Sequence, residues 1–398
     1  MEFDICIVGA GTWGSAVAYH LTSENPNKLR VCLIGPEEPQ DRSNATIFGS
    51  YFDEGRITKV ADQNIIWGHL AKRSLERHRE VEQKSGISFY EEVGYLFLGD
   101  KYVKKQADLH ADLYAPATKL DSQEMNEKFP FLASSTGLYS NTNAGYINIR
   151  KQRLAHQKLA KLKGCIIISD VVDDIQECSN HLHLLTTYTG MHIHSKKVLL
   201  TTGAFTGFRN LIPGNVVPDM EITTERVILC ELSEDVVCRM KSMPSILYKP
   251  DDLSNSCYIL PPIKYPDGKY YLKVGHGVWG NIPLKTNRAI IQHFRNQEAS
   301  WITSKLYKIM KNVMADFTML SVKYDTCVTS KTPTGYLYCD MITETLGILV
   351  GGNGYGAKSA DEIGKMGAMM IRNCGWEYDL PQREFKIKLK PLIIESQL

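Results

Sequence analysis

Residues 3 to 14 read Phe3-Asp-Ile-Cys-Ile-Val-Gly-Ala-Gly-Thr-Trp-Gly14, an apolar run that leads into a glycine-rich turn. β-Branched residues before such a turn are typical of a parallel strand covered on both faces. Gly9, Gly11 and Gly14 fit G-x-G-x-x-G, which permits a tight turn, a close pyrophosphate and close helix packing. A second strand follows at Arg30-Val-Cys-Leu-Ile34. This order predicts a βαβ unit that binds a dinucleotide at its helix N-terminus.

The end of the second predicted strand departs from this pattern. An acidic residue usually stands there and binds the ribose hydroxyls, but this chain has Gly35. Glu37 and Glu38 follow closely, and either could supply the missing carboxylate. The motif therefore predicts a dinucleotide without specifying which one.

Length and composition are those of a soluble globular protein with a large core. The 398 residues are 43% hydrophobic and 23% charged, with a formal net charge of +2. Such a balance gives no electrostatic footprint for nucleic acid or an anionic membrane. The ten cysteines show no C-x-x-C and no Cys/His spacing, so we expect reduced thiols, no disulfide framework and no metal site.

The two ends of the chain give information on the cellular compartment of the protein. The first predicted strand starts at about residue 3, which leaves no room for a signal peptide, and no apolar run is long enough for a membrane span. We therefore expect an intracellular protein, cytoplasmic or peroxisomal. The last residues, Ser396-Gln397-Leu398, are a weak version of the peroxisomal S-K-L signal, and an ordinary tail is the alternative interpretation.

Two kinds of pattern alternate along the chain and predict two interleaved domains. Buried βα segments indicate a Rossmann-like domain made of residues 1–85, 150–215 and 320–398. Residues 86–149 and 216–319 contain alternating strands and indicate a mostly antiparallel substrate domain. The expected fold class is α/β with an α+β second domain.

Three local segments bear on the site. Residues 43–59 form a polar, glycine-punctuated loop that could cross a cofactor. Residues 89–98 predict a β-hairpin with a buried second strand. Residues 347–356 predict a last strand and a glycine loop that lead into a helix at 359–373.

Five short blocks lie in order along nearly the whole chain. They are Gly9 to Gly14, Gly55-Arg-Ile-Thr-Lys59, Leu272-Lys-Val-Gly275, Cys327-Val-Thr-Ser-Lys-Thr-Pro333 and Gly351-Gly-Asn-Gly-Tyr-Gly-Ala-Lys358. Together they resemble the D-amino-acid-oxidase superfamily of FAD oxidoreductases. Within it they are similar to the group of monomeric sarcosine oxidase, pipecolate oxidase and N-methyltryptophan oxidase.

The resemblance implies FAD, with its ADP half on the opening βαβ unit and its flavin linked covalently to Cys327 through a thioether. Such a tether would lessen the dependence on a ribose contact at Gly35. The residues matched to the cofactor site are Gly9, Gly11, Thr12, Trp13, Gly14, Glu37, Ser43, Arg56, Val172, Gly203, Cys327, Gly352, Asn353, Gly354, Tyr355, Gly356 and Lys358.

It also implies a monomeric oxidase of secondary or primary amines, such as an N-methyl or cyclic amino acid. The amine would become an imine, and O2 would be reduced to hydrogen peroxide. The catalytic candidates are Lys273, Arg56, Tyr258 and His276, and the substrate-binding candidates are Lys59, Lys358 and Tyr258.

Two of these candidates carry most of the chemistry. Lys273 matches the lysine that promotes oxygen reduction, since a fixed cation stabilises charge that develops on oxygen. Lys59 stands where the family usually has an arginine that grips the substrate carboxylate. A lysine is a point charge and binds anions with less directionality.

Three alternatives stay open at this stage. A flavin dehydrogenase would pass electrons to a carrier instead of O2. A nicotinamide-dependent dehydrogenase could use the same βαβ unit, but it would purify as a colourless protein. A flavoprotein without catalytic activity is the third alternative.

Overall fold

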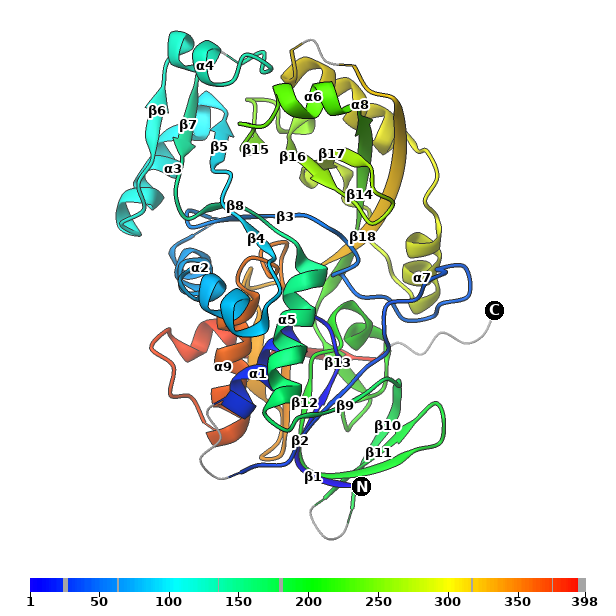
Figure 1. The fold of residues 1–398 in the computed structure, drawn as a ribbon. Coiled ribbons are helices and arrows are strands. Elements are labelled where there is room, and N and C mark those ends of the chain that lie inside the picture. The colour runs from blue at the N-terminus through cyan, green and yellow to red at the C-terminus, as the bar shows by residue number, and fades with distance from the viewer. Residues whose placement is uncertain are drawn as a thin grey trace.

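The protein has two lobes, each built on its own eight-stranded sheet (Figure 1). The computed structural model describes residues 1–23, 28–62, 64–134, 136–178, 182–315, 318–373 and 375–392. The C-terminal tripeptide Ser396-Gln397-Leu398 lies outside these residues. Within them, no helix has the length and apolar character needed to cross a bilayer.

The first lobe follows the predicted βαβ pattern. β1 (Glu2–Val8) pairs in parallel with β2 (Val31–Ile34) and with β12 (His192–Leu200). β2 is buried along its whole length, as its β-branched residues predict. The strands that extend this sheet are β9 (Ile166–Ile168), β10 (Val172–Glu177), β11 (His183–Thr187), β19 (Tyr338–Met341) and β20 (Leu346–Val350).

Helix α1 (Thr12–Ser23) begins directly after the glycine turn. Gly9 has a φ of 115°, which glycine adopts without the steric cost of a side chain. A Cβ on Gly14 would overlap the Gly9 carbonyl oxygen, so only glycine lets α1 pack this close to the turn. On its other sides α1 packs against α5 (Ile149–Leu162) and α9 (Ala360–Asn373).

A buried carboxylate joins these helices. Asp361, at the start of α9, accepts hydrogen bonds from His20 Nε2 (3.1 Å), His156 Nε2 (3.0 Å) and Arg77 Nε (2.6 Å). Arg77 lies on α2 (Ile65–Ser85). Burial alone would raise the pKa of Asp361, but these partners hold it well below its ordinary value. The four helices are thereby fixed to one another on the first sheet.

The second lobe contains a sheet with the order β18-β14-β17-β16-β15-β5-β7-β6. Its neighbouring strands are antiparallel except for the pair β5 and β15, as predicted for a mostly antiparallel domain. The strands are β5 (Tyr95–Leu98), β6 (Thr118–Leu120), β7 (Gly137–Ser140), β14 (Glu221–Leu232), β15 (Ser245–Tyr248), β16 (Cys257–Lys264), β17 (Tyr270–His276) and β18 (Ser321–Lys331).

The pairing of strand β18 does not agree with the domain boundary expected at residue 320. That boundary assigns β18 to the Rossmann-like domain, but β18 pairs with β14 from Ser321 to Lys331. Its alternating pattern identifies a strand without showing which sheet the strand joins. β18 therefore carries Cys327 on the second lobe.

A small third sheet lies between the lobes (Figure 1). Here β8 (Ala144–Ile147) pairs with β3 (Arg56–Lys59) and with β4 (Tyr90–Glu91). The hairpin expected at residues 89–98 is wrong, because β4 and β5 belong to different sheets. Gly94, with a φ of 83°, turns the chain from one sheet to the other.

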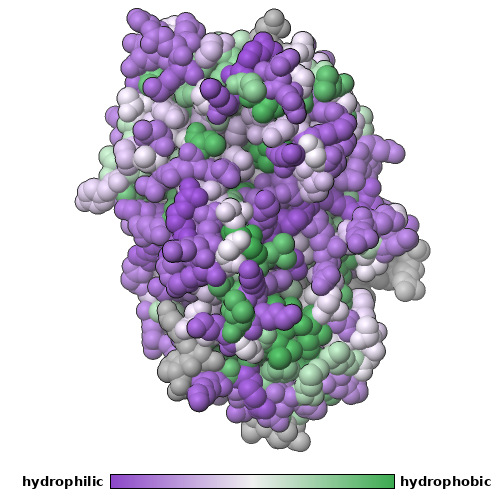
Figure 2. Space-filling model, viewed as in Figure 1, coloured by the Kyte–Doolittle hydropathy of each residue, from purple (hydrophilic) through white to green (hydrophobic). Residues whose placement is uncertain are grey.

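The remaining elements cover the two lobes. Figure 2 shows a mostly hydrophilic face with an apolar patch in its lower half, in the region of β9. The other described elements with regular structure are α3 (Asp100–Asp112), α4 (Ser122–Lys128), α6 (Glu234–Arg239), α7 (Asn287–Arg295), α8 (Trp301–Val313), β13 (Val216–Pro218) and β21 (Leu389–Pro391).

Candidate active site

One cavity of about 800 Å³ reaches from the glycine turn after β1 to the sheet of the second lobe. It gathers residues that lie far apart in the sequence, and it is the place where the five sequence blocks meet. The predicted site residues that line it are Gly9, Gly11, Thr12, Trp13, Glu37, Arg56, Lys59, Val172, Gly203, Tyr258, Lys273, His276, Cys327, Gly352, Asn353, Gly354, Tyr355, Gly356 and Lys358.

Two predicted cofactor residues lie outside this lining. Gly14 faces the turn and has the packing role described above. Ser43 is exposed, and both its N–H (2.8 Å) and its hydroxyl (2.5 Å) donate to the Asp41 carboxylate. Its polar atoms therefore close a local turn, and the assignment of Ser43 to the cofactor site is corrected.

The glycine turn end of the cavity fits a dinucleotide. A Cβ on Gly11 would meet no atom within 4 Å, so open space lies over the N-terminus of α1, where a pyrophosphate is favoured. Gly35 lies against the turn, and a Cβ there would overlap the Ala10 nitrogen. This contact explains why an acidic residue cannot stand at the end of β2.

The two acids after Gly35 have different environments. Glu38 accepts two hydrogen bonds from Arg150, at 2.5 and 2.6 Å. Glu37 lines the cavity, whereas Glu38 is not among its lining residues. Of the two candidates for the missing carboxylate, the geometry favours Glu37.

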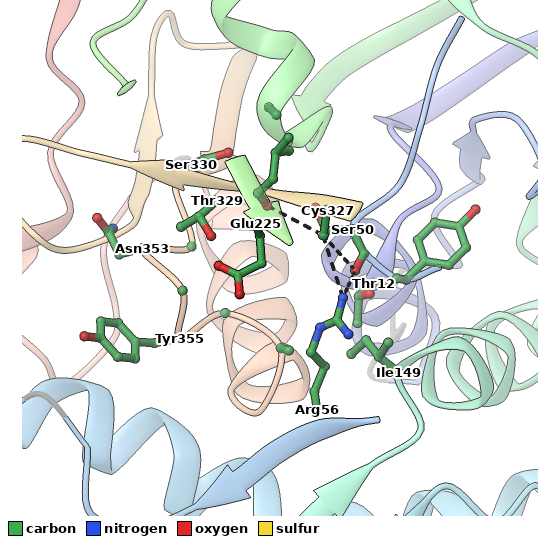
Figure 3. Close-up of a pocket in the computed structure, with 18 of the residues that line it drawn as sticks. Thr12, Ser50, Arg56, Ile149, Glu225, Cys327, Thr329, Ser330, Asn353 and Tyr355 are labelled. Carbon is green, nitrogen blue, oxygen red and sulfur yellow. Dashed lines mark hydrogen bonds between the residues drawn. The ribbon is translucent and has the colours of Figure 1, made fainter. Parts of the chain in front are cut away.

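Cys327 and Arg56 lie side by side in the cavity wall, as Figure 3 shows. The Arg56 Nη2 lies 3.7 Å from the Cys327 sulfur and 3.0 Å from the Ser50 carbonyl oxygen. His293 Nε2 lies 2.9 Å from the Cys327 carbonyl oxygen and anchors the backbone of β18. The Cys327 thiol is partly buried and lines the cavity.

The glycine loop after β20 closes another side of the cavity. Asn353 donates from Nδ2 to the Gly351 carbonyl oxygen (2.7 Å), and its Oδ1 accepts from the Thr332 N–H (2.9 Å). Trp13 donates from Nε1 to the Gly356 carbonyl oxygen (2.9 Å). The loop is thus tied both to the end of β18 and to the start of α1.

Lys273 is a buried cation with a carboxylate partner. It lies on β17, is 1% exposed, forms an ion pair with Asp53 and donates to the Gly55 carbonyl oxygen at 3.0 Å. Asp53 also pairs with Arg56 and accepts a hydrogen bond from the Tyr265 hydroxyl at 3.1 Å. Burial lowers the pKa of Lys273 well below its ordinary value.

The structure also brings Lys59 and Lys358 together, around Asp62. Lys358 Nζ lies 2.5 Å and Lys59 Nζ 3.8 Å from oxygens of this carboxylate, and all three side chains are buried. The pKa of Lys59 is lowered to about 7, with burial as the largest cause, opposed by the charge of Asp62 and aided by that of Lys358.

Tyr258 and His276 differ in what they offer to a ligand. The Tyr258 ring lines the cavity, with its centroid 5.7 Å from Lys273 Nζ. His276 Nε2 accepts from the Arg226 N–H (3.0 Å), so Nδ1 carries the proton and donates to the Gly277 carbonyl oxygen (2.7 Å). Because both ring nitrogens bond to backbone, His276 braces the strand ends, and its assignment as a catalytic group is corrected.

The sequence interpretation missed several polar residues of the cavity wall. Asp53 and Asp62 flank the block that ends at Lys59, and this proximity was their only sequence signal. Lys105, Gln106 and Lys249 also line the cavity, but they lie in segments without a recognisable motif.

Fold and cavity together fit a two-lobed protein that binds a dinucleotide. The family model described as FAD dependent oxidoreductase (DAO) matches residues 4–370, and the chain belongs to this family. This confirms the predicted superfamily, and the cavity residues fit FAD. Thr12, Glu37, Val172, Gly203 and the loop 351–356 would hold it.

Individual relatives agree with this assignment. Monomeric sarcosine oxidase from Arthrobacter sp. (strain TE1826) is 20% identical over 400 residues, which cover 95% of each chain. Peroxisomal sarcosine oxidase from Mus musculus is 22% identical over 273 residues, or 66% of each chain. The structure of NikD, an unusual amino acid oxidase essential for nikkomycin biosynthesis, has 14% identity and a TM-score of 0.76, with 98% of each chain covered. The predicted fold class is confirmed.

Proposed function

We propose that the protein is an FAD-dependent oxidase of secondary or primary amines, with N-methyl or cyclic amino acids as the substrate class. The observation that carries this proposal is the placement of Lys273, Cys327, Lys59 and Lys358 around one cavity that also contains the dinucleotide turn. When bound, FAD supplies two-electron oxidation of a CH–NH group and the transfer of those electrons to O2, which yields an imine and hydrogen peroxide.

The cofactor end of the cavity would fix FAD at two places. The N–H groups at the start of α1 would bind the pyrophosphate. Cys327, in the cavity wall, would carry the covalent thioether link to the flavin. A link at this strand also suits Arg56, whose guanidinium lies beside the sulfur and offers a fixed positive charge there.

The substrate would be oriented by charge. Lys59 and Lys358 would hold its carboxylate, while Tyr258 lines the wall next to Lys273. No general base is needed if the amine binds in its neutral form. Lys273 would provide the fixed cation for oxygen reduction, with Asp53 as its counterion.

One observation favours a second candidate, a flavin dehydrogenase. Because Asp53 pairs with Lys273, the positive charge available to stabilise reduced oxygen is partly offset. Turnover of an amine panel in air separates the two candidates. An oxidase releases one hydrogen peroxide for each amine consumed, whereas a dehydrogenase consumes amine only when an artificial electron acceptor is added.

The covalent link is tested on a denaturing gel viewed for flavin fluorescence. We expect a fluorescent band for the wild type that is completely lost in Cys327→Ala, because no other sulfur replaces the thioether. Cys257→Ala is the matched control, since Cys257 also lines the cavity but lies on β16. A yellow wild-type protein that releases all its flavin on denaturation would contradict the link at Cys327.

A further inference from the structure

We propose that the substrate carries a second anionic group, a carboxylate or a phosphate, and that Lys105 and Lys249 bind it. This inference rests on the proposed function, in which Lys59 and Lys358 hold the carboxylate next to the amine. The second group would lie at the part of the cavity formed by α3 and by the chain after β15.

The first observation is an excess of positive charge. Six described lysines line the cavity, and four of them, Lys59, Lys105, Lys249 and Lys358, interact with Asp62 or with one another. Asp62 forms ion pairs with Lys59 and Lys358. Among the described residues, no carboxylate forms an ion pair with Lys105 or Lys249. Asp62 is thus shared by two buried lysines, while the half-buried Lys249 and the exposed Lys105 are available to a ligand.

The surroundings of Lys249 show that these charges act on one another. Burial is the largest cause that lowers the pKa of Lys249, and the charges of Lys105 and Lys358 lower it further, whereas Asp62 raises it. Lys249 therefore lies in an electropositive and partly desolvated environment. An anion bound there would offset the mutual repulsion of the lysines, and a partly desolvated site strengthens that attraction.

A second, independent observation points to a polar ligand at the same wall. Gln106 follows Lys105 on α3, lines the cavity and is 8% exposed. Its Oε1 has no hydrogen-bond partner among the described residues. A buried amide oxygen without a partner is costly, and a ligand that brings an N–H or O–H group to this wall would satisfy it.

The wall also has apolar parts that indicate how the two anionic groups are connected. Phe97 on β5 and Leu247 on β15 line the cavity near the same elements, and Tyr102 lines it from α3. Such a lining suits methylene groups between two charged ends. The substrate class is therefore an N-methyl or cyclic amino acid whose side chain ends in a carboxylate or phosphate.

The test compares inert acids that bind to the oxidised holoenzyme, with affinity measured by calorimetry and by the change in flavin absorbance. Glutarate has two carboxylates, pentanoate has one on the same number of carbons, and 4-phosphonobutyrate replaces the second carboxylate with a phosphonate. We expect glutarate, 4-phosphonobutyrate or both to bind about tenfold more tightly than pentanoate, as for one charge-assisted hydrogen bond. Whichever of the two binds more tightly identifies the second group.

Substitutions locate the effect. Lys249→Met and Lys105→Met should each remove most of the preference for the doubly charged acid and leave pentanoate affinity unchanged. Lys104→Met, at the exposed neighbour on α3 outside the cavity lining, should keep the preference. Equal affinity for all three acids would overturn the proposal, and so would a Lys249→Met variant that loses pentanoate and glutarate affinity equally.

The result is separable from the fate of the proposed function. If the lysine-dependent preference is found but no amine in a broad panel reduces the flavin, the second anion site is supported and amine oxidation is refuted. If amines are oxidised but doubly charged acids have no advantage, the second anion site is refuted and amine oxidation stands.

Discussion

Lys273 and the group of four lysines around Asp62 line one cavity but differ in their charge balance. Lys273 is paired with Asp53 and bonded to the Gly55 carbonyl oxygen, so its charge is matched within the protein. Around Asp62, by contrast, two buried lysines share one carboxylate, and among the described residues Lys105 and Lys249 form no ion pair with an acid. A matched buried charge is a permanent part of the wall, whereas unmatched charges attract an anion from outside. In the proposed function, this difference distinguishes Lys273, a fixed charge, from the lysines that would bind the substrate.

The largest expected effect comes from separating the ion pair of Asp53 and Lys273. Asp53→Asn leaves Lys273 buried without its acid, and removing one partner of a buried pair costs about 3 kcal/mol of unfolding free energy. Urea denaturation of the holoenzyme measures this loss. Tyr265→Phe, which removes only one hydrogen bond to Asp53, should cost about 1 kcal/mol.

A double variant shows whether the loss comes from the charge. Asp53→Asn combined with Lys273→Met no longer leaves a buried unpaired cation, so part of the lost stability should return. If the loss of unfolding free energy in the double variant equals the sum of the losses in the two single variants, Asp53 and Lys273 do not depend on each other and the comparison fails.

At the second group, removing the acid should have the opposite effect on ligands. Asp62→Asn removes the internal anion that competes for Lys59 and Lys358, so pentanoate should bind about threefold to tenfold more tightly. Calorimetric titration of the holoenzyme measures the affinity. Asp170→Asn serves as the control, because Asp170 also lines the cavity but accepts a hydrogen bond from Thr189 and, among the described residues, forms no ion pair. Unchanged affinity in Asp62→Asn would mean that Asp62 does not compete with the ligand.

The nucleotide-binding half of the fold was predictable because its signals are local. The strand, the glycine turn and α1 are consecutive in the sequence, and Gly9 and Gly14 have backbone roles that no other residue fills. The reason for Gly35 was not predictable, because its neighbour Ala10 comes close only after β1 and β2 pair.

The charge balance of the site could not be predicted from the sequence, for a related reason. Asp53 and Lys273 are 220 residues apart, and nothing in either segment names the other as its partner. The same limit explains β18, whose pattern predicts a strand but whose neighbour β14 is fixed only by the folded sheet. Family resemblance supplied the cations at Lys59, Lys273 and Lys358, but it did not supply the acids that face them.

The smallest expected effect is a pH dependence of anion binding at Lys59, one of the lysines around Asp62. Burial lowers the pKa of Lys59 to about 7, so this lysine is charged below pH 7 and loses its proton as the pH rises through that value. Pentanoate stays ionised over this range, and its affinity should therefore fall above pH 7, by at most about tenfold for each pH unit. Lys358, the second lysine of the proposed carboxylate site, also pairs with Asp62 and limits the fall.

The free energy of unfolding should change with pH in the direction opposite to pentanoate affinity. The pKa of Lys59 in the folded protein is lower than its ordinary value of 10.5, so between these two values the unfolded chain binds a proton that the folded protein does not. Stability from this group consequently rises with pH in that window.

Lys59→Arg is the control for the pentanoate measurement. It keeps its charge throughout, so its profile of pentanoate affinity against pH should be flat. A wild-type profile that is equally flat would show that Lys59 keeps its proton, and Asp62 would then offset the effect of burial more strongly than the geometry around Lys59 indicates.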